Sequence, residues 1–267
     1  MDKHTIRWFD RYLKGIDNGV DRDPEVRNYA MGAVGEEGAP GNVWRSSSRW
    51  PLTDTPTSYY LRTGDKLATK PSEEAVESSS LKADPDNPAK IPAGGFPGGK
   101  DARDFEKQAN VLTYTTDVLT EPVEWTGRVQ AELFIESSAK DTDFIVRISD
   151  VYPDGRSILI MDYIRRARYR DGYDKEVFLE PGKVAKIAFD VANLSQIFNR
   201  GHRIRVTVAS TGAPFYEVNP NTGEPLTIEP PPKKVVATNV IEHSKANASR
   251  IIAPVRVILP QKPERSR

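Results

Sequence analysis

Alternation between apolar and polar positions dominates the second half of the chain. It recurs in five runs whose apolar side chains stand two residues apart: Val129, Ala131, Leu133 and Ile135; Phe144, Val146 and Ile148; Ile187, Phe189 and Val191; Ile204, Val206 and Val208; Val255, Val257 and Leu259. Because successive side chains of a strand point to opposite faces, this spacing predicts strands with one buried face. Five such runs separated by turn residues predict a mainly β fold of stacked antiparallel sheets, arranged as a jelly roll or Greek key.

Two short segments between these runs have the composition of tight turns. Asp154 and Gly155 separate two strand-like runs, and both tolerate the positive φ that a two-residue hairpin needs. In the segment 180–183, Pro181 fixes φ and Gly182 accepts a left-handed conformation. We therefore expect the chain to reverse direction at both places.

The first residues of the chain follow the period of a helix instead. In the segment HTIRWFDRYLKG, neighbouring positions of a helix surface gather the large apolar side chains, which are Ile6, Trp8, Phe9, Tyr12 and Leu13. Gly15 then supplies a C-terminal stop. A helix of about a dozen residues is marginal on its own. We therefore expect another surface to cover this aromatic face.

Two further segments show weaker patterns. Leu194, Ile197 and Phe198 are spaced as on a helix and Gly201 follows them, which predicts a single helical turn between two strands. The stretch 63–105 is rich in Ser, Pro, Gly and Asp and has almost no periodicity. It is interpreted as a long loop ordered by its contacts, with disorder as the alternative.

Composition narrows the classes of partner. The 267 residues contain 38 Lys and Arg against 38 Asp and Glu, without a long block of like charge, so nucleic acid and anionic membranes are not expected partners. No apolar run reaches the roughly 18 residues of a spanning helix, and the start lacks a signal-peptide layout. The chain is expected to be soluble. The absence of cysteine excludes disulfides, thiolate metal sites and a cysteine nucleophile.

The sequence contains no evident catalytic machinery. A serine hydrolase needs a serine on a sharp strand-to-helix turn, a histidine beside it and an orienting acid. The motif Gly-x-Ser-x-Gly is absent, and the three histidines, His4, His202 and His243, stand in contexts typical of surface or structural side chains. We therefore assign no catalytic residue and expect the chain alone to be inactive.

An acidic group invites comparison with a calcium site. It consists of Asp141, Asp143, Asp150 and Asp154. These residues lack the compact one-loop spacing of a calcium site, so we favour bracing of a loop, with Asp141 and Asp143 accepting backbone N–H bonds and pairing with the nearby Arg165, Arg166 or Arg168. No metal or cofactor site is predicted.

The segment TGAPFYEVNPNTGEP contains the residues that we single out as a candidate cleft-facing or interface loop: Phe215, Tyr216, Asn219 and Asn221. Its Asn, Pro and Gly residues prescribe a rigid path, and rigid loops at strand ends are usual places of ligand contact. A purely architectural loop is the favoured alternative. Trp8 and Phe9 of the first helix complete the candidate interface residues.

Several motifs stand in an order that resembles one family. HTIRWFDRYLKG is followed by WRSSSRWP, ADPDNPAKIPAGG, VLTYTTDVL, PVEWTGRV, DTDF, DVYPDGR and HSKANASRIIAPV. This series resembles the C-terminal part of the Xaa-Pro dipeptidyl-peptidase and cocaine-esterase (CocE/NonD) family of serine hydrolases, and it covers nearly the whole chain. The family commonly has Pro where Ala248 stands.

The resemblance implies a division of the chain. Residues 1–62 would be a terminal helix and strands left from the end of an α/β-hydrolase domain and its crossover. Residues 63–110 would be a long linking loop, and 111–260 a jelly-roll β-sandwich with galactose-binding-like topology. Residues 261–267 would be a tail.

The resemblance also implies a function. Members hydrolyse an ester or amide bond through an acyl-enzyme and without a cofactor, but their nucleophile, acid and base belong to the α/β-hydrolase domain, so none maps onto this chain. The expected partner is such a catalytic domain, upstream or on a separate chain, whose active site the β-sandwich would wall. Two alternatives stay open: a free-standing carbohydrate- or peptide-binding jelly roll, and a structural domain that forms homo-oligomers. The sequence indicates neither compartment nor substrate.

Overall fold

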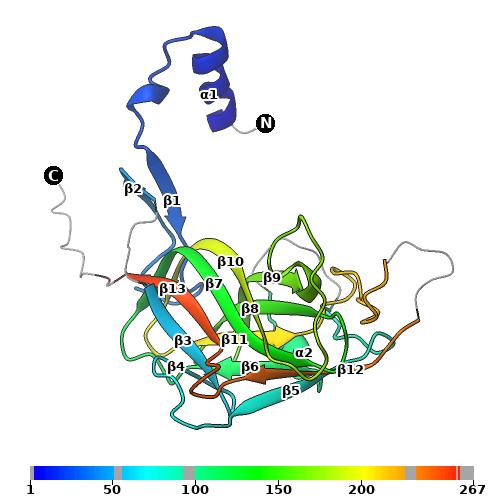
Figure 1. The fold of residues 1–267 in the computed structure, drawn as a ribbon. Helices are drawn as coiled ribbons and strands as arrows, with labels where there is room; N and C mark the ends of the chain where they lie inside the picture. Colours follow the sequence, from blue (N-terminus) through cyan, green and yellow to red (C-terminus); the bar gives the residue numbers. More distant parts are fainter. Residues whose placement is uncertain (1–2, 51–55, 93–99, 226–232, 257, 259–267) are drawn as a thin grey trace.

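The computed structural model describes residues 3–50, 56–92, 100–225, 233–256 and 258 (Figure 1). Two helices and two 3₁₀ turns occur in this part of the chain: α1 (Lys3–Lys14), α2 (Arg103–Glu106), η1 (Val20–Arg22) and η2 (Ala167–Tyr169). The rest of its regular structure is strand: β1 (Val26–Ala30), β2 (Val43–Ser47), β3 (Pro56–Arg62), β4 (Lys66–Ala68), β5 (Ser78–Ala83), β6 (Val111–Thr115), β7 (Val123–Ser137), β8 (Asp143–Val151), β9 (Ser157–Arg166), β10 (Ala185–Phe198), β11 (Arg203–Ala209), β12 (Ala237–Glu242) and β13 (Arg250–Arg256).

Eleven of the strands belong to one continuous sheet. Its order is β5-β12-β7-β13-β3-β4-β6-β11-β8-β9, and β10 pairs with β7 outside this path. The link between β4 and β6 is parallel, through Lys66 and Thr115, while the pairings on either side of it are antiparallel. Side chains from both ends of the path share one hydrophobic core, so the sheet folds over on itself.

The predicted alternation explains this core. Leu133 and Ile135 of β7, Ile148 of β8 and Val206 of β11 are all fully buried, because every second residue of each strand faces inward. Four of the five predicted runs lie in β7, β8, β10 and β11. The fifth begins in β13 at Val255, while residues 257 and 259 lie outside the described residues. The mainly β class is confirmed, and the jelly-roll topology stays a prediction.

Both predicted turns are present. Gly155 has a φ of 87° between β8 and β9, and its N–H donates to the carbonyl of Tyr152 over 2.9 Å. Gly182 has a φ of 76°, and the N–H of Lys183 closes the turn on the carbonyl of Glu180 over 3.0 Å. Positive φ is the conformation that favours glycine at these positions.

The prediction of a helical turn at 194–198 is wrong. These residues form the end of β10, where Phe198 pairs with Val123 of β7. Two features produced the misleading spacing: a bulge between Asp190 and Ala192 shifts the alternation, and the strand beyond it is buried on both faces. Apolar residues therefore occur on either side of the strand, without a helical period.

The interpretation of 63–105 as a loop also needs correction. Two strands and a helix, β4, β5 and α2, lie in this stretch. The sequence of β5, SSSLKA, buries only Leu81 and Ala83, too few apolar positions to reveal a period. Residues 93–99 and the expected tail at 261–267 lie outside the described residues. The proposed division into domains stays a prediction.

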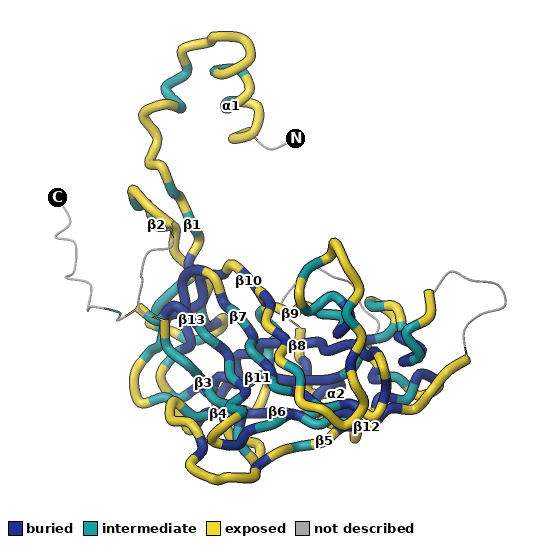
Figure 2. Tube along the Cα trace, viewed as in Figure 1, coloured by how far each residue is buried: buried dark blue, intermediate teal, exposed yellow. Residues whose placement is uncertain are grey.

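The N-terminal residues form a projection that we call the arm, defined as residues 3–47. Figure 1 shows α1 and the β1–β2 ribbon extending away from the folded sheet. The five residue pairs of β1 and β2 make a two-stranded sheet of their own. Figure 2 shows that exposed positions dominate the arm, whereas buried positions gather in the sandwich formed by the other strands.

Candidate functional site

The first candidate surface is the apolar face of α1, which exists as predicted and lies open to solvent. Trp8 is 50% exposed, Tyr12 55% and Leu13 74%, and no residue of α1 is buried. The aromatic rings contact one another, with 4.6 Å between the centroids of Trp8 and Tyr12 and 5.5 Å between those of Trp8 and Phe9. A contiguous exposed aromatic patch is typical of a contact surface.

The polar side of α1 has local partners. The Nη2 atom of Arg7 donates to the carbonyl of Asn18 over 3.1 Å, and the Asn18 side chain donates to the carbonyl of Arg7 over 2.6 Å. Arg7 also pairs with Asp23 at 2.5 Å. Gly15, with a φ of 70°, ends the helix. These bonds fix α1 to the segment that follows it and leave the aromatic face outward.

The β1–β2 ribbon adds a second exposed aromatic group on the same arm. Tyr29 of β1 and Trp44 of β2 have ring centroids 5.4 Å apart, and the Arg27 guanidinium lies 4.9 Å from the centroid of the Trp44 ring. Trp44 is 62% exposed. Apolar surface on the arm is therefore not confined to the helix.

The second candidate surface is the loop that follows β11, and its asparagines act as internal braces. Asn219 is buried and its Nδ2 atom donates to Asp141 over 2.9 Å and to Asp143 over 2.8 Å. The Asn221 side chain donates to the carbonyls of Ala83 and Val235 over 3.1 and 2.8 Å. These asparagine amides therefore fix the path of the loop.

The acidic residues beneath this loop pair with arginines, as predicted. Arg166 donates to both oxygens of Asp143 over 2.9 and 3.0 Å, and Arg168 donates to Asp141 over 2.8 Å. Burial raises the pKa of Asp143 although its hydrogen bonds to Arg166 favour the ionised form. The segment that carries these arginines leaves the extended conformation of β9 at η2.

The aromatic residues of the loop differ in exposure. The hydroxyl of Tyr216 donates to Asp162 over 2.9 Å, and burial together with that carboxylate raises the pKa of Tyr216. Phe215 is 48% exposed. Among the four predicted loop residues, Phe215 thus offers the most open apolar side chain, while Asn219 and Asn221 are buried.

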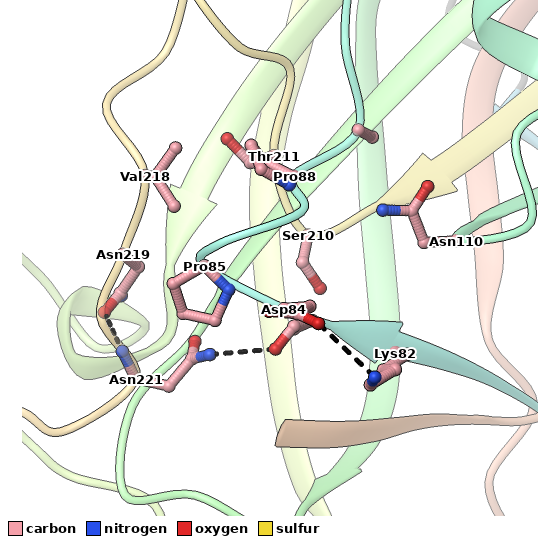
Figure 3. A pocket seen from close by; sticks show the side chains of 12 residues that line it. Lys82, Asp84, Pro85, Pro88, Asn110, Ser210, Thr211, Val218, Asn219 and Asn221 are labelled. Atoms are coloured by element: carbon pink, nitrogen blue, oxygen red, sulfur yellow. Dashed lines mark hydrogen bonds and ion pairs between the residues drawn. The ribbon is translucent and has the colours of Figure 1, made fainter. Parts of the chain in front are cut away.

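A hollow lies beside the braced loop. Figure 3 shows Asn219 and Asn221 on one side of it and Lys82, Asp84 and Asn110 on the others. Its volume is only about 20 Å³, but an adjoining hollow of about 320 Å³ shares four of its lining residues: Lys82, Asp84, Pro88 and Asn110. Sequence alone does not reveal these hollows, because the run ADPDNP, which lines them in part, indicates only turns.

The structure does not join the two predicted sets of interface residues. Trp8 and Phe9 lie on α1 at the far end of the arm, whereas the 215–221 loop lies on the sandwich, next to β5 and β8 (Figure 1). They are therefore two separate surfaces.

The buried histidines do not complete a catalytic triad. The Nε2 atom of His243 lies 2.9 Å from Oγ of Ser79, but its Nδ1 atom is buried without a hydrogen-bond partner, so no acid orients the ring. Both nitrogens of His202 face carboxylates, those of Asp150 and Glu36. The structural interpretation of these two histidines fits their surroundings.

Two further findings concern metals and membranes. Within the described ranges, no cluster of three or more His, Cys, Asp or Glu side chains could hold a metal ion. None of the helices in the described part of the chain has the length and apolar character needed to span a bilayer.

Comparison with known proteins gives a consistent set of matches. A family model described as the X-Pro dipeptidyl-peptidase C-terminal non-catalytic domain matches residues 18–252. The cocaine esterase of Rhodococcus sp. (strain MB1 Bresler) is 35% identical over 263 residues, which are 93% of this chain and 44% of that protein. The chain thus spans less than half the length of this relative.

Solved structures agree. An aminopeptidase from a marine sediment archaeon, Thaumarchaeota archaeon, superposes with a TM-score of 0.80 at 26% identity, over 95% of this chain and 43% of that one. An α-amino acid ester hydrolase gives the same TM-score and identity over 94% of this chain and 44% of that one.

Proposed function

We propose that this chain, which belongs to the family of X-Pro dipeptidyl-peptidase C-terminal non-catalytic domains, packs on an α/β-hydrolase domain and walls one side of its active-site cleft. The observation that carries the proposal is the uncovered aromatic face of α1. A 12-residue helix gains most of its stability from packing of its apolar face, and in the described chain Trp8, Phe9 and Tyr12 on this face remain 43% to 55% exposed. A second folded surface would stabilise it.

The division of labour follows from the side chains. No Gly-x-Ser-x-Gly motif is present in the sequence, and the Ser79–His243 contact lacks an acid. The hydrolase domain would therefore supply the nucleophile, acid and base for cleavage of an ester or amide bond through an acyl-enzyme. The sandwich would supply a rigid wall and the arm a means of attachment.

The non-catalytic role is tested with a fluorophosphonate probe on the purified chain. We expect no labelling of any serine, Ser79 included, because no base is oriented to activate one. Stoichiometric labelling that a single Ser→Ala substitution abolishes would reject the proposal.

The attachment is tested in a full-length chimaera, in which this chain replaces the matching 44% of the Rhodococcus cocaine esterase. We expect the chimaera to hydrolyse an activated ester. Replacing Trp8 and Phe9 together by Ser should lower its activity at least tenfold, since packing of two aromatic side chains is worth several kcal/mol. The matched control is Tyr173→Ser, because Tyr173 is 66% exposed on the sandwich and should tolerate replacement.

The two hollows beside the braced loop favour a second candidate, a carbohydrate- or peptide-binding module. Amide and charged side chains line them, including Lys82, Asp84 and Asn110, and such groups suit hydroxyl or peptide ligands. A glycan array with and without Ca²⁺ tests this candidate. Binding that Asn110→Ala abolishes would support it, and signal at background in both conditions would remove it.

A further inference from the structure

His202 connects the arm to the sandwich through a buried chain of polar contacts. Its side chain is fully buried at the start of the turn into β11. The Nδ1 atom lies 2.7 Å from Oδ1 of Asp150, at the end of β8, and the Nε2 atom lies 2.9 Å from Oε1 of Glu36. Asp150 belongs to the sandwich, while Glu36 belongs to residues 31–42, the connection between β1 and β2. We call this connection the docking loop.

The docking loop contacts β10 and the β8–β9 turn. The ribbon beside it is also attached, since Asn28 of β1 donates to Oγ of Ser195 over 3.0 Å and Arg45 of β2 pairs with Glu124 of β7 at 2.6 Å. The N–H of Met31 donates to the carbonyl of Ser195, and the N–H of Ile197 donates to the carbonyl of Met31, over 2.9 and 2.8 Å. The N–H of Val34 donates to the hydroxyl of Tyr152 over 2.9 Å. Glu36 adds the contact with His202 described above. Its second carboxylate oxygen accepts a hydrogen bond from the Asn199 side chain over 2.7 Å.

When both carboxylates are ionised, the contacts of His202 need a proton on each ring nitrogen. A neutral imidazole has a single N–H, so one nitrogen would present its lone pair to a carboxylate. The imidazolium form donates to both Asp150 and Glu36. Burial opposes that charge, but the hydrogen bonds and the charges of the two carboxylates raise the pKa of His202 above its ordinary value of 6.5.

The other charged groups around the ring are few. Burial raises the pKa of Asp150, although its bond to His202 favours ionisation. Burial also opposes ionisation of Glu36, but its bonds from Asn199 and His202 hold its pKa below 4.5. The centroids of the Tyr152 and His202 rings lie 4.3 Å apart, and the Arg156 guanidinium lies 4.5 Å from the centroid of the Tyr152 ring. Arg156 is an additional positive charge that acts on Glu36.

We infer that Asp150, His202 and Glu36 form a latch that holds the docking loop on the sandwich while the imidazolium persists and loosens that loop when His202 loses its proton. The direction of the pH effect follows because the contact and the protonation of His202 stabilise each other. A group whose pKa is raised by the contact supports that contact at low pH and loses it as pH rises through the raised pKa. Glu36 is the end that moves, because its side chain is 28% exposed and that of Asp150 is 1% exposed.

The latch is tested by the distance between two spin labels on the full chain. The sequence contains no cysteine, so Glu37→Cys in the docking loop and Lys183→Cys on the sandwich give unique positions, and both residues are exposed. We expect a narrow distance distribution at about pH 6 and at least a twofold broader one at about pH 9, because the neutral histidine no longer holds Glu36. An unchanged width over this range would overturn the inference.

Two substitutions of Glu36 separate the latch from other titrations. In Glu36→Gln the amide can donate to the neutral Nε2 atom or accept from the protonated one, so the distribution should stay narrow at both pH values. In Glu36→Ala it should be broad at both. Broadening of Glu36→Gln at high pH to the wild-type extent, or a narrow distribution in Glu36→Ala, would contradict the latch. His4→Gln, on exposed α1, is the matched control and should behave as the wild type.

Discussion

The arm and the sandwich treat the same residue types in opposite ways. Trp125 of β7 is fully buried, with its ring centroid 4.9 Å from that of Tyr59 and 5.3 Å from that of Phe198. Trp8 of the arm also stacks on neighbours but is 50% exposed. The sandwich therefore closes its own core, whereas the apolar surface of the arm stays exposed in the described part of the chain. That difference is our reason for proposing the arm as the surface that meets a partner.

The polar residues show the same contrast. Asp141 and Arg168 are almost fully buried and bond to each other at 2.8 Å. The ion pairs of α1, such as Arg11 with Asp21 at 3.3 Å, lie at the surface. A buried charge that loses its partner destabilises the fold strongly. An ion pair at the surface contributes little to the free energy of unfolding. We therefore expect the sandwich to supply most of the stability, and we propose the arm as the recognition surface.

The largest expected effect is the loss of Trp125. Trp125→Ala should lower the free energy of unfolding by about 4 kcal/mol, through lost burial and the cavity that remains. Trp8→Ala, its matched control, should change it by less than about 0.5 kcal/mol. Urea denaturation followed by far-ultraviolet circular dichroism measures both. Equal losses would show that the arm is part of the cooperative core.

The next effect concerns the buried ion pair. Arg168→Met removes the guanidinium and leaves the Asp141 carboxylate without its charged partner, so it should destabilise the chain by about 3 kcal/mol. Lys183→Met breaks the exposed pair with Glu180 and should give no measurable change. The same denaturation assay compares them. A stable Arg168→Met variant would mean that the remaining donors to Asp141 suffice.

A third prediction sets His243 against His202. Burial lowers the pKa of His243 from 6.5 to about 4, so the unfolded chain binds the extra proton. The contribution of neutral His243 to the free energy of unfolding should therefore be complete above pH 6.5. It should fall by about 2 to 3 kcal/mol as the pH drops toward 4. His243→Gln should flatten this slope. His202 acts in the opposite direction, since its contribution disappears as pH rises.

The smallest effect on stability, with a visible effect on association, belongs to α1. Replacing Trp8 and Phe9 together by Ser should change the free energy of unfolding by less than about 1 kcal/mol, because both side chains are already about half exposed. It should reduce any self-association of the isolated chain, as sedimentation velocity would show. Identical sedimentation of the variant and a strictly monomeric wild type would argue against a sticky face.

Much of the fold could be predicted because strand alternation and turn chemistry are local. The two-residue spacing of Leu133 and Ile135 predicts a strand, and the residue type of Gly155 predicts a turn. The prediction for the end of β10 was wrong partly because this strand pairs along its outer edge with Met31, which lies more than 150 residues earlier in sequence. Local pattern carries no information about such a neighbour.

The candidate sites were predictable to different degrees. The aromatic face of α1 is encoded within one helix and could be recognised from spacing. The brace formed by Asn219 joins residues 78 positions apart, and the pair of Glu36 and His202 joins residues 166 apart. Sequence indicated Asp141 as a loop brace and Asn219 as a loop residue, but only the fold brings these two together and Glu36 to His202.

The most direct test of the arm as a docking element is amide hydrogen exchange of α1, measured in the isolated chain and in the full-length chimaera with the cocaine esterase catalytic part. The account predicts that the amides of residues 7–14 exchange almost freely in the isolated chain, because a short helix without a packed face is marginal. It predicts at least hundredfold protection in the chimaera, while β7 stays equally protected in both. Equal exchange of α1 in the two proteins would contradict the account.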